Sequence, residues 1–163
     1  MSKLVTIESL KKEIKLLKKQ NKKIGFCYGV FDVLHLGHIK HLEVAKKLCD
    51  VLVVGVTSDK YVKKRKDSGR PIFNEGSRAY LVSRLKPVDF VFIRHEDAAV
   101  QDIKRIKPDL CIKGGDYLGS KDKYLLLEME AARAVGGKMV FTKTGKYLNV
   151  TTTKILEKLN NGK

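Results

Sequence analysis

Long apolar runs, paired cysteines and acidic residues are scarce in this sequence. No stretch reaches the roughly 18 consecutive apolar residues that a membrane-spanning helix requires, and residues 1–6 contain no apolar stretch of signal-peptide length. Both absences argue against a membrane partner and lead us to expect a cytoplasmic protein. The three cysteines, Cys27, Cys49 and Cys111, form no Cys-x-x-Cys pair and lie in or beside apolar runs. We therefore interpret them as reduced core residues.

Acidic residues are outnumbered by basic ones, 18 against 34, which gives a formal net charge of +16. Such a charge favours anionic partners, and nucleic acid and phosphorylated metabolites both qualify. Seven of the lysines lie between Lys11 and Lys23, so much of the excess belongs to one segment. The total charge therefore does not identify the partner.

The lysine-rich segment also carries apolar residues at helical spacing, namely Ile7, Leu10, Ile14 and Leu17. This pattern predicts a basic amphipathic helix over about residues 7–20, docked on the core by its apolar face with the lysines in solvent. Binding of RNA or of an acidic membrane through the lysine face is the alternative. The length of 163 residues, without an internal repeat or linker, predicts a single domain over residues 1–163.

Short apolar runs recur along the chain and are separated by segments with room for helices. We expect strands at residues 24–30, 51–57, 90–93, 110–112 and 139–141, and helices at about 37–48, 75–85, 98–106, 123–135 and 152–159. Apolar strands that alternate with helices indicate a parallel sheet covered on both faces. The predicted fold class is α/β, a Rossmann-like, doubly wound, mainly five-stranded parallel sheet. Such sheets bind ligands at the carboxyl ends of their strands.

The first apolar run leads into the segment His35–His38 and then into a predicted helix. A helix N-terminus has free N–H groups and the positive end of the helix dipole, so it attracts anions. Two histidines three residues apart can both face a phosphate there, and Gly37 lets that phosphate approach the backbone. The alternative is that the histidines only cap or pack the helix. No metal site is predicted, because no third ligand is near and zinc usually needs at least three.

The residues around this segment resemble a known signature. The stretch Gly29-Val30-Phe31-Asp32-x-x-His35-x-Gly37-His38 is similar to the G-x-F-D-x-x-H-x-G-H pattern of the cytidylyltransferase-like nucleotidyltransferases, and the similarity covers about residues 23–159. The resemblance implies the HIGH-type nucleotidyltransferase fold. It also implies an enzyme that transfers a nucleoside monophosphate from a nucleoside triphosphate to a phosphorylated small molecule and releases pyrophosphate. A homodimer is a further implication.

Two motifs narrow the resemblance. The stretch Lys113-Gly114-Gly115-Asp116-Tyr117 and the pair Arg70-Pro71 are most similar to the nucleotidyltransferase domain of ADP-heptose synthases. That similarity implies ATP, or CTP, as the nucleotide and a heptose 1-phosphate or another sugar 1-phosphate as the acceptor.

Two other functions stay open at this point. The first is a CTP-dependent glycerol-3-phosphate or other alcohol-phosphate cytidylyltransferase. Glycerol-3-phosphate enzymes carry a basic substrate-binding residue where residues 97–102 have none, which lowers this alternative. The second, from a different class, is a non-catalytic relative that binds anions or RNA, although nucleic acid is not the partner we expect. Sequence alone decides neither the base nor the acceptor.

The resemblance implies that His35 and His38 contact the triphosphate. Hydrogen-bond donors placed in advance stabilise the charge that gathers in the transition state, so we predict both histidines as catalytic residues. The acceptor is already a phosphate dianion, and in-line attack therefore needs no covalent enzyme intermediate. Beside the histidines, Val30, Phe31 and Gly37 are predicted to bind the nucleotide.

A basic loop after the second strand supplies the predicted second clamp on the phosphates. We prefer Lys66 as a catalytic residue in this loop and predict its neighbour Lys64 as a substrate-binding residue; a solvated surface loop is the alternative. Asp32 and Arg78 are also predicted to bind substrate. Arg78 has two interpretations, phosphate binding or pairing with Glu75.

The loop after the fourth strand and the start of the last helix complete the predicted nucleotide site. The resemblance implies that the loop lines the nucleotide pocket, and one threonine hydroxyl should cap the helix while its free N–H groups face the β- and γ-phosphates. Mg²⁺ is expected with the triphosphate, held largely by substrate oxygens and water, because no carboxylate cage is visible. The residues assigned here are Lys113, Gly114, Asp116, Thr151, Thr152 and Thr153.

Overall fold

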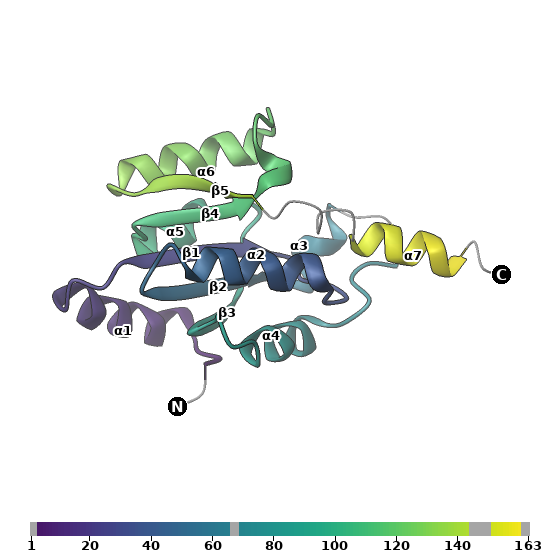
Figure 1. Cartoon of the computed structure of the whole chain (residues 1–163), viewed down its shortest axis with the longest axis horizontal. Helices are drawn as coiled ribbons and strands as arrows, with labels where there is room; N and C mark the ends of the chain where they lie inside the picture. Colours follow the sequence, from purple (N-terminus) through teal and green to yellow (C-terminus); the bar gives the residue numbers. More distant parts are fainter. Residues whose placement is uncertain (1–2, 66–68, 144–150, 161–163) are drawn as a thin grey trace.

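The chain folds around a five-stranded sheet, seen here in a computed structural model that describes residues 3–65, 69–143 and 151–160. All strand pairs are parallel, and the strand order is β3-β2-β1-β4-β5. The order reverses between β1 and β4, which confirms the predicted doubly wound α/β class (Figure 1). The strands are β1 (Ile24–Gly29), β2 (Val51–Thr57), β3 (Phe90–Arg94), β4 (Leu110–Gly114) and β5 (Lys138–Thr142).

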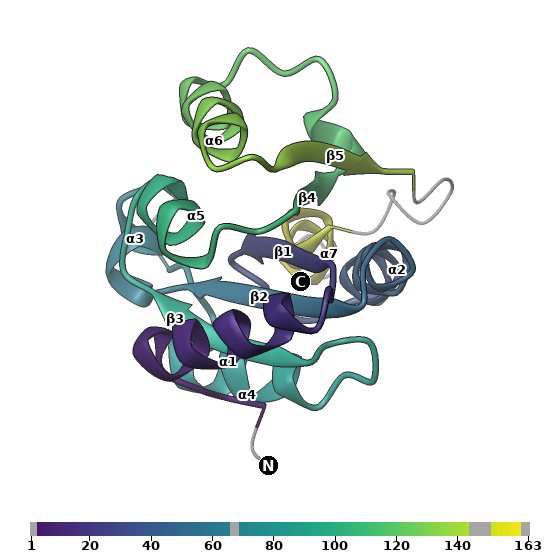
Figure 2. The ribbon, with the colours of Figure 1, turned by 90° about the vertical axis from the view of Figure 1, so that its left-hand side faces the viewer.

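Helices cover both faces of this sheet (Figure 2). Helices α1, α5 and α6 pack on one face, and α2 and α4 pack on the other. The described helices are α1 (Ile7–Lys19), α2 (Leu36–Lys46), α3 (Asp59–Lys63), α4 (Glu75–Ser83), α5 (Val100–Ile106), the 3₁₀ turn η1 (Gly115–Tyr117), α6 (Lys123–Ala134) and α7 (Thr152–Asn160). None of the helices in the described part of the chain is long and apolar enough to cross a membrane.

The two faces of the sheet form separate apolar clusters because successive strand residues point to opposite sides. In β1, Phe26 belongs to the cluster under α1, α5 and α6, whereas its neighbour Cys27 belongs to the cluster under α2 and α4. Every residue of β2 is buried. Continuous burial explains why this strand reads as an uninterrupted apolar run in the sequence.

The lysine-rich N-terminal segment forms helix α1, which packs on the core. Leu10 and Ile14 are fully or almost fully buried in the cluster that includes α5, and Thr6 caps the helix by accepting a hydrogen bond from the Ser9 amide. Lys11, Lys12 and most of the other lysines of α1 are exposed. The apolar face of α1 therefore accounts for its docking without any partner.

The cysteines are free, and their burial makes them poor nucleophiles. Cys27 and Cys111 are buried and Cys49 is half-buried. Burial raises the pKa of Cys49 to about 11 and that of Cys111 to about 12. Because the thiolate is the reactive form, these values agree with the predicted role as reduced core residues.

Candidate active site

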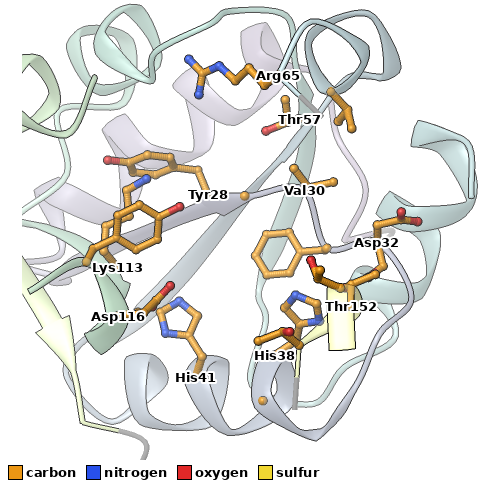
Figure 3. Close-up of a pocket in the computed structure, with 18 of the residues that line it drawn as sticks. Tyr28, Val30, Asp32, His38, His41, Thr57, Arg65, Lys113, Asp116 and Thr152 are labelled. Atoms are coloured by element: carbon orange, nitrogen blue, oxygen red, sulfur yellow. The ribbon is translucent and has the colours of Figure 1, made fainter. Parts of the chain in front are cut away.

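A cavity of about 670 Å³ opens at the carboxyl ends of β1 and β4, where the strand order reverses. A cavity of this volume suits a small ligand. Figure 3 shows Tyr28 and Lys113 on one side of it and His38 and Thr152 on another. The predicted residues that line the cavity are Val30, Phe31, Asp32, His35, Gly37, His38, Lys113, Gly114, Asp116, Thr151, Thr152 and Thr153.

The loop between β1 and α2 has an unusual backbone. Phe31 and Val33 have φ values of 53° and 49°, in the left-handed region that a β-branched residue such as valine rarely adopts. Between them, the buried Asp32 carboxylate accepts hydrogen bonds from the amides of Ile72 and Phe73, at 2.9 and 3.1 Å, and from Arg70 Nε at 2.8 Å. These bonds hold the loop in its strained form, as is common at functional sites.

Both carboxylate oxygens of Asp32 accept hydrogen bonds. Burial raises the pKa of Asp32, but the hydrogen bonds from Ile72, Phe73 and Arg70 outweigh that effect, so the pKa lies below its ordinary value. The residue does line the cavity, although only 1% of it is exposed. Its bonding favours an anchoring role for Asp32 over the substrate contact expected from the sequence.

The paired histidines lie at the start of α2. His35 is the N-cap, and its Nδ1 accepts a hydrogen bond from the Gly37 amide at 3.1 Å. A neutral ring that accepts at Nδ1 carries its proton on Nε2, so His35 has one N–H to donate. The rings of His35 and His38 are stacked with their centroids 3.9 Å apart. His35 thus both caps α2 and lines the cavity.

Burial keeps these rings uncharged. It lowers the pKa of His38 to about 3, with a further contribution from His35 and His41, and it lowers the pKa of His41 to about 4. The pKa of His35 is also lowered by burial. The buried Nδ1 of His38 has no hydrogen-bond partner among the described residues. The histidines at the start of α2 therefore face the cavity as neutral rings.

The start of α7 borders the same cavity. The Thr151 hydroxyl accepts a hydrogen bond from the Lys154 amide at 3.2 Å, which confirms that a threonine caps this helix. The Thr152 hydroxyl donates to the backbone carbonyl of Asp32 at 2.6 Å. That bond ties α7 to the β1–α2 loop, so two helix N-termini, each able to attract an anion, open onto one cavity.

A largely buried lysine, Lys113, lies at the end of β4. Lys113 Nζ lies 3.2 Å from Glu128 Oε2 and over the rings of Tyr28 and Tyr117, at 3.9 and 4.8 Å from their centroids. Burial lowers the pKa of Lys113, although Glu128 opposes that shift. A Cβ atom at Gly115 would meet the carbonyl oxygen of Thr142 at 2.6 Å, so glycine is required where the loop after β4 passes β5.

Several residues that line the cavity were not predicted from the sequence. His41 follows His38 at i+3 on the same helix, a spacing that could have revealed it. Arg94 is a charged residue at the end of the apolar run of β3, and that contrast is the signal it offered, whereas Glu128 lies on the half-exposed helix α6 and offered none. The lining residues not assigned from the sequence include Tyr28, His41, Thr57, Arg65, Arg70, Arg94, Tyr124 and Glu128.

Two predicted substrate contacts among the described residues, Lys64 and Arg78, do not line the cavity. Lys66 lies outside the described residues. Lys64 is 54% exposed and lies 3.7 Å from Asp97, whereas its neighbour Arg65 lines the cavity. Arg78 is 0% exposed and its ion-pair partner is Asp59, at 2.7 Å, rather than Glu75.

Neither predicted role of Arg78, phosphate binding or pairing with Glu75, agrees with the structure. Its guanidinium donates hydrogen bonds to the carbonyl oxygens of Phe73, Val30 and Thr57. A fully buried guanidinium with these partners has no surface with which to bind a phosphate. Arg78 instead joins the ends of β1 and β2 to the segment that precedes α4.

The lowered pKa values predict that acid weakens the fold. An unfolded histidine titrates near 6.5, whereas His38 titrates at about 3 in the folded protein. Between these pH values the unfolded chain binds a proton that the folded chain does not, so the free energy of unfolding falls as the pH drops below 6.5. We expect a His38→Asn variant to lose about 1 kcal/mol of the difference between pH 7.5 and 5.5 in urea unfolding.

The exposed His95 provides the matched control. A His95→Asn variant is expected to keep the full pH dependence of the wild-type protein. An identical pH dependence in His38→Asn and wild type would contradict the assignment of a neutral, buried His38.

A parallel, doubly wound sheet, whose first strand leads into paired histidines at a helix N-terminus, defines an enzyme of the nucleotidyltransferase class. The chain belongs to the cytidylyltransferase-like family, because the model of that family matches residues 26–158.

Named relatives agree with this assignment. The chain is 51% identical over 105 residues, 64% of its length, to Bifunctional protein HldE of Nitratiruptor sp.. It is 40% identical over 157 residues, 96% of its length, to the HldE protein of Campylobacter jejuni subsp. jejuni. These matches cover 23% and 32% of the two relatives, so the chain spans about a quarter to a third of their length.

Solved structures share the fold. A lipopolysaccharide core biosynthesis protein from Thermoplasma volcanium is 36% identical, with a TM-score of 0.62 and coverage of 75% of this chain and 97% of that one. A pantoate-β-alanine ligase from Francisella tularensis also has a TM-score of 0.62, at 16% identity, with coverage of 96% and 76%. The second likeness shows the fold alone.

Proposed function

We propose that the protein transfers a nucleoside monophosphate from a nucleoside triphosphate, ATP first, to a heptose 1-phosphate or another sugar 1-phosphate, with release of pyrophosphate. The observation that carries this proposal is the arrangement of the stacked His35 and His38 beside the N-terminus of α7 on one cavity. Both elements offer N–H donors to a polyphosphate. The motif resemblance to ADP-heptose synthases and the similarity to the HldE proteins support a phosphorylated sugar as acceptor.

In the proposed reaction an oxygen of the acceptor phosphate attacks the α-phosphorus of the nucleotide. A new phosphorus–oxygen bond forms there, the bond to the β-phosphate breaks, and its electron pair leaves with pyrophosphate. The acceptor oxygen is already ionised, so no general base is needed and catalysis rests on positioning and charge stabilisation. His35 and His38 supply N–H donors to the phosphate oxygens as charge develops.

The loop Lys113–Tyr117 is the proposed wall of the base pocket. Gly114 and Asp116 line the cavity, and backbone groups of this loop would distinguish adenine from cytosine. We rank ATP above CTP because the loop resembles that of ADP-heptose synthases. Lys66 as phosphate clamp, a homodimer and a cytoplasmic location stay predictions from the sequence.

Mg²⁺ enters this proposal as part of the nucleotide substrate. Among the residues that the structure describes, no group of three or more His, Cys, Asp or Glu side chains is placed to hold a metal ion. Two carboxylates at the cavity are already engaged, Asp32 with Arg70 and Glu128 with Lys113. Triphosphate oxygens and water would therefore supply the ligands of the ion.

A pyrophosphate-release screen tests the proposal. Purified protein with Mg²⁺ would be offered ATP, CTP, GTP or UTP, each with D-glycero-β-D-manno-heptose 1-phosphate, mannose 1-phosphate, sn-glycerol 3-phosphate or phosphocholine. We expect the highest rate with ATP and the heptose. A preference for CTP and glycerol 3-phosphate would favour the alcohol-phosphate alternative, and no release from any pair would refute the proposed activity.

A further inference from the structure

A group of largely buried polar side chains lies at the cavity, and four of its five members line the cavity wall. In Figure 3 its members Tyr28 and Lys113 lie together, apart from His38 and Thr152. We call it the Arg94 cluster, and its members are Tyr28, Arg94, Asp102, Lys113 and Glu128.

One nitrogen atom of the Arg94 guanidinium, Nη2, has no hydrogen-bond partner among the described residues. Its Nε donates to Asp102 Oδ2 at 2.9 Å, and its Nη1 donates to Thr57 Oγ1 at 3.4 Å. Its Nη2 is buried and has no hydrogen-bond partner among the described residues, although Arg94 lines the cavity. Since a buried donor without a partner costs free energy, an oxygen atom of a ligand would satisfy it.

The charges of the Arg94 cluster balance. The Arg94 and Asp102 side chains are each 3% exposed and form an ion pair, and Lys113 pairs with Glu128. The Tyr28 hydroxyl donates to Glu128 at 2.8 Å, and burial, first of all, raises the pKa of Tyr28, so that ring stays neutral. The cluster thus offers a spare donor without a net positive charge, which suits a neutral hydroxyl better than a second phosphate or a carboxylate.

Three tyrosine rings of the cavity already have protein cations over them. A quaternary ammonium group binds over open aromatic faces. Lys113 Nζ already lies over Tyr28 and Tyr117, and Arg65 lies 3.9 Å from the centroid of Tyr124. Cations of the protein thus occupy the rings, which disfavours an acceptor such as phosphocholine.

We propose that Arg94 determines acceptor specificity by donating its Nη2 hydrogen to a hydroxyl oxygen in the sugar or polyol part of the phosphorylated acceptor. Asp102 holds the guanidinium in place. This inference rests on the proposed function and adds to it a residue that selects the acceptor by its hydroxyl groups. A site built to bond a hydroxyl discriminates strongly against a ligand that lacks one, because the donor is then left unpaired.

The test compares wild type with Arg94→Lys, which keeps a positive charge beside Asp102 but loses the planar Nη2 donor. We expect kcat/KM for the hydroxylated acceptor to fall by about 10- to 100-fold, the worth of a hydrogen bond from a charged donor, while KM for the nucleotide changes by less than about twofold. Arg133→Lys, at an exposed arginine of α6, is the matched control and should behave like wild type.

A second variant separates loss of the Nη2 donor from loss of the fold. Arg94→Met alone would leave the buried Asp102 carboxylate unpaired, so the double variant Arg94→Met/Asp102→Leu replaces the whole ion pair by apolar residues, which is often tolerated. It should keep the wild-type melting temperature within a few degrees and show the same loss toward the acceptor.

Calorimetric binding separates this inference from the proposed activity. D-glycero-β-D-manno-heptose 1-phosphate and sn-glycerol 3-phosphate would be titrated into wild type and Arg94→Lys, with phosphocholine as the acceptor without hydroxyls. Weaker binding of the hydroxylated ligands to the variant supports the role of Arg94 even without turnover. Equal binding of the hydroxylated ligands to both proteins would overturn the role of Arg94 and leave the proposed activity, measured by pyrophosphate release, in place. The role of Arg94 would also be overturned if the wild type bound neither hydroxylated ligand, or if it bound phosphocholine more tightly than either of them.

Discussion

Replacement of His38 by asparagine is expected to lower the rate of pyrophosphate release by about 10²- to 10³-fold, the usual cost of one preorganised donor to a developing oxyanion. His38 stacks on His35 with the ring centroids 3.9 Å apart, and its buried Nδ1 has no partner among the described residues. Asparagine retains polarity at this position, but its shorter amide changes the place of the donor. Initial rates at saturating nucleotide and acceptor measure the effect.

His95→Asn is the control, because His95 is exposed and does not line the cavity. It should keep the wild-type rate, and both variants should keep the wild-type circular dichroism spectrum. A rate for His38→Asn within about twofold of the wild-type rate would show that His38 is not a catalytic residue.

The same variant separates the enzyme from a non-catalytic anion-binding relative. The exposed lysines of α1 are the feature that favours such a relative, and they lie on a different element from His38. RNA binding through them would weaken with salt and survive the His38 substitution. Salt-sensitive RNA binding by a wild-type protein that releases no pyrophosphate would favour that alternative.

The sequence predicts the central strands β1 and β2 well because they are buried on both faces. The run Val51–Thr57 matches β2 residue for residue. The strands β4 and β5 extend beyond their apolar runs, since pairing of Lys113 with Phe141 and of Gly114 with Thr142 continues the ladder through residues of lower hydrophobicity. Strand ends of this kind depend on the neighbouring strand, which periodicity does not reveal.

Short helices and contacts between residues far apart in the chain could not be predicted from the sequence. Helix α3 has five residues, most of them polar, so no apolar periodicity marks it. The residues taken from the motif around His35 line the cavity because a local signature places them at one strand–helix junction. Arg94 and Glu128 instead come from β3 and α6, and only the folded sheet brings them to the cavity.

Substitution of Arg78 by methionine is expected to lower the free energy of unfolding by about 3–5 kcal/mol, the range for breaking a buried ion pair by removing one partner. The guanidinium binds Asp59 at 2.7 Å and the carbonyl oxygens of Val30, Thr57 and Phe73. Methionine fills much of the space but bonds to none of these oxygens. Urea unfolding followed by circular dichroism measures the loss.

Arg84→Met is the matched control, since Arg84 follows α4 directly and is exposed; its free energy of unfolding should change by less than about 0.5 kcal/mol. A phosphate-binding Arg78 would show the opposite pattern, with the acceptor KM raised and the stability unchanged. The two results separate a contact with the substrate from a contact that builds its pocket. Because Arg78 joins the carbonyl oxygen of Val30 to that of Thr57, its loss should also loosen the β1–α2 loop that presents His35.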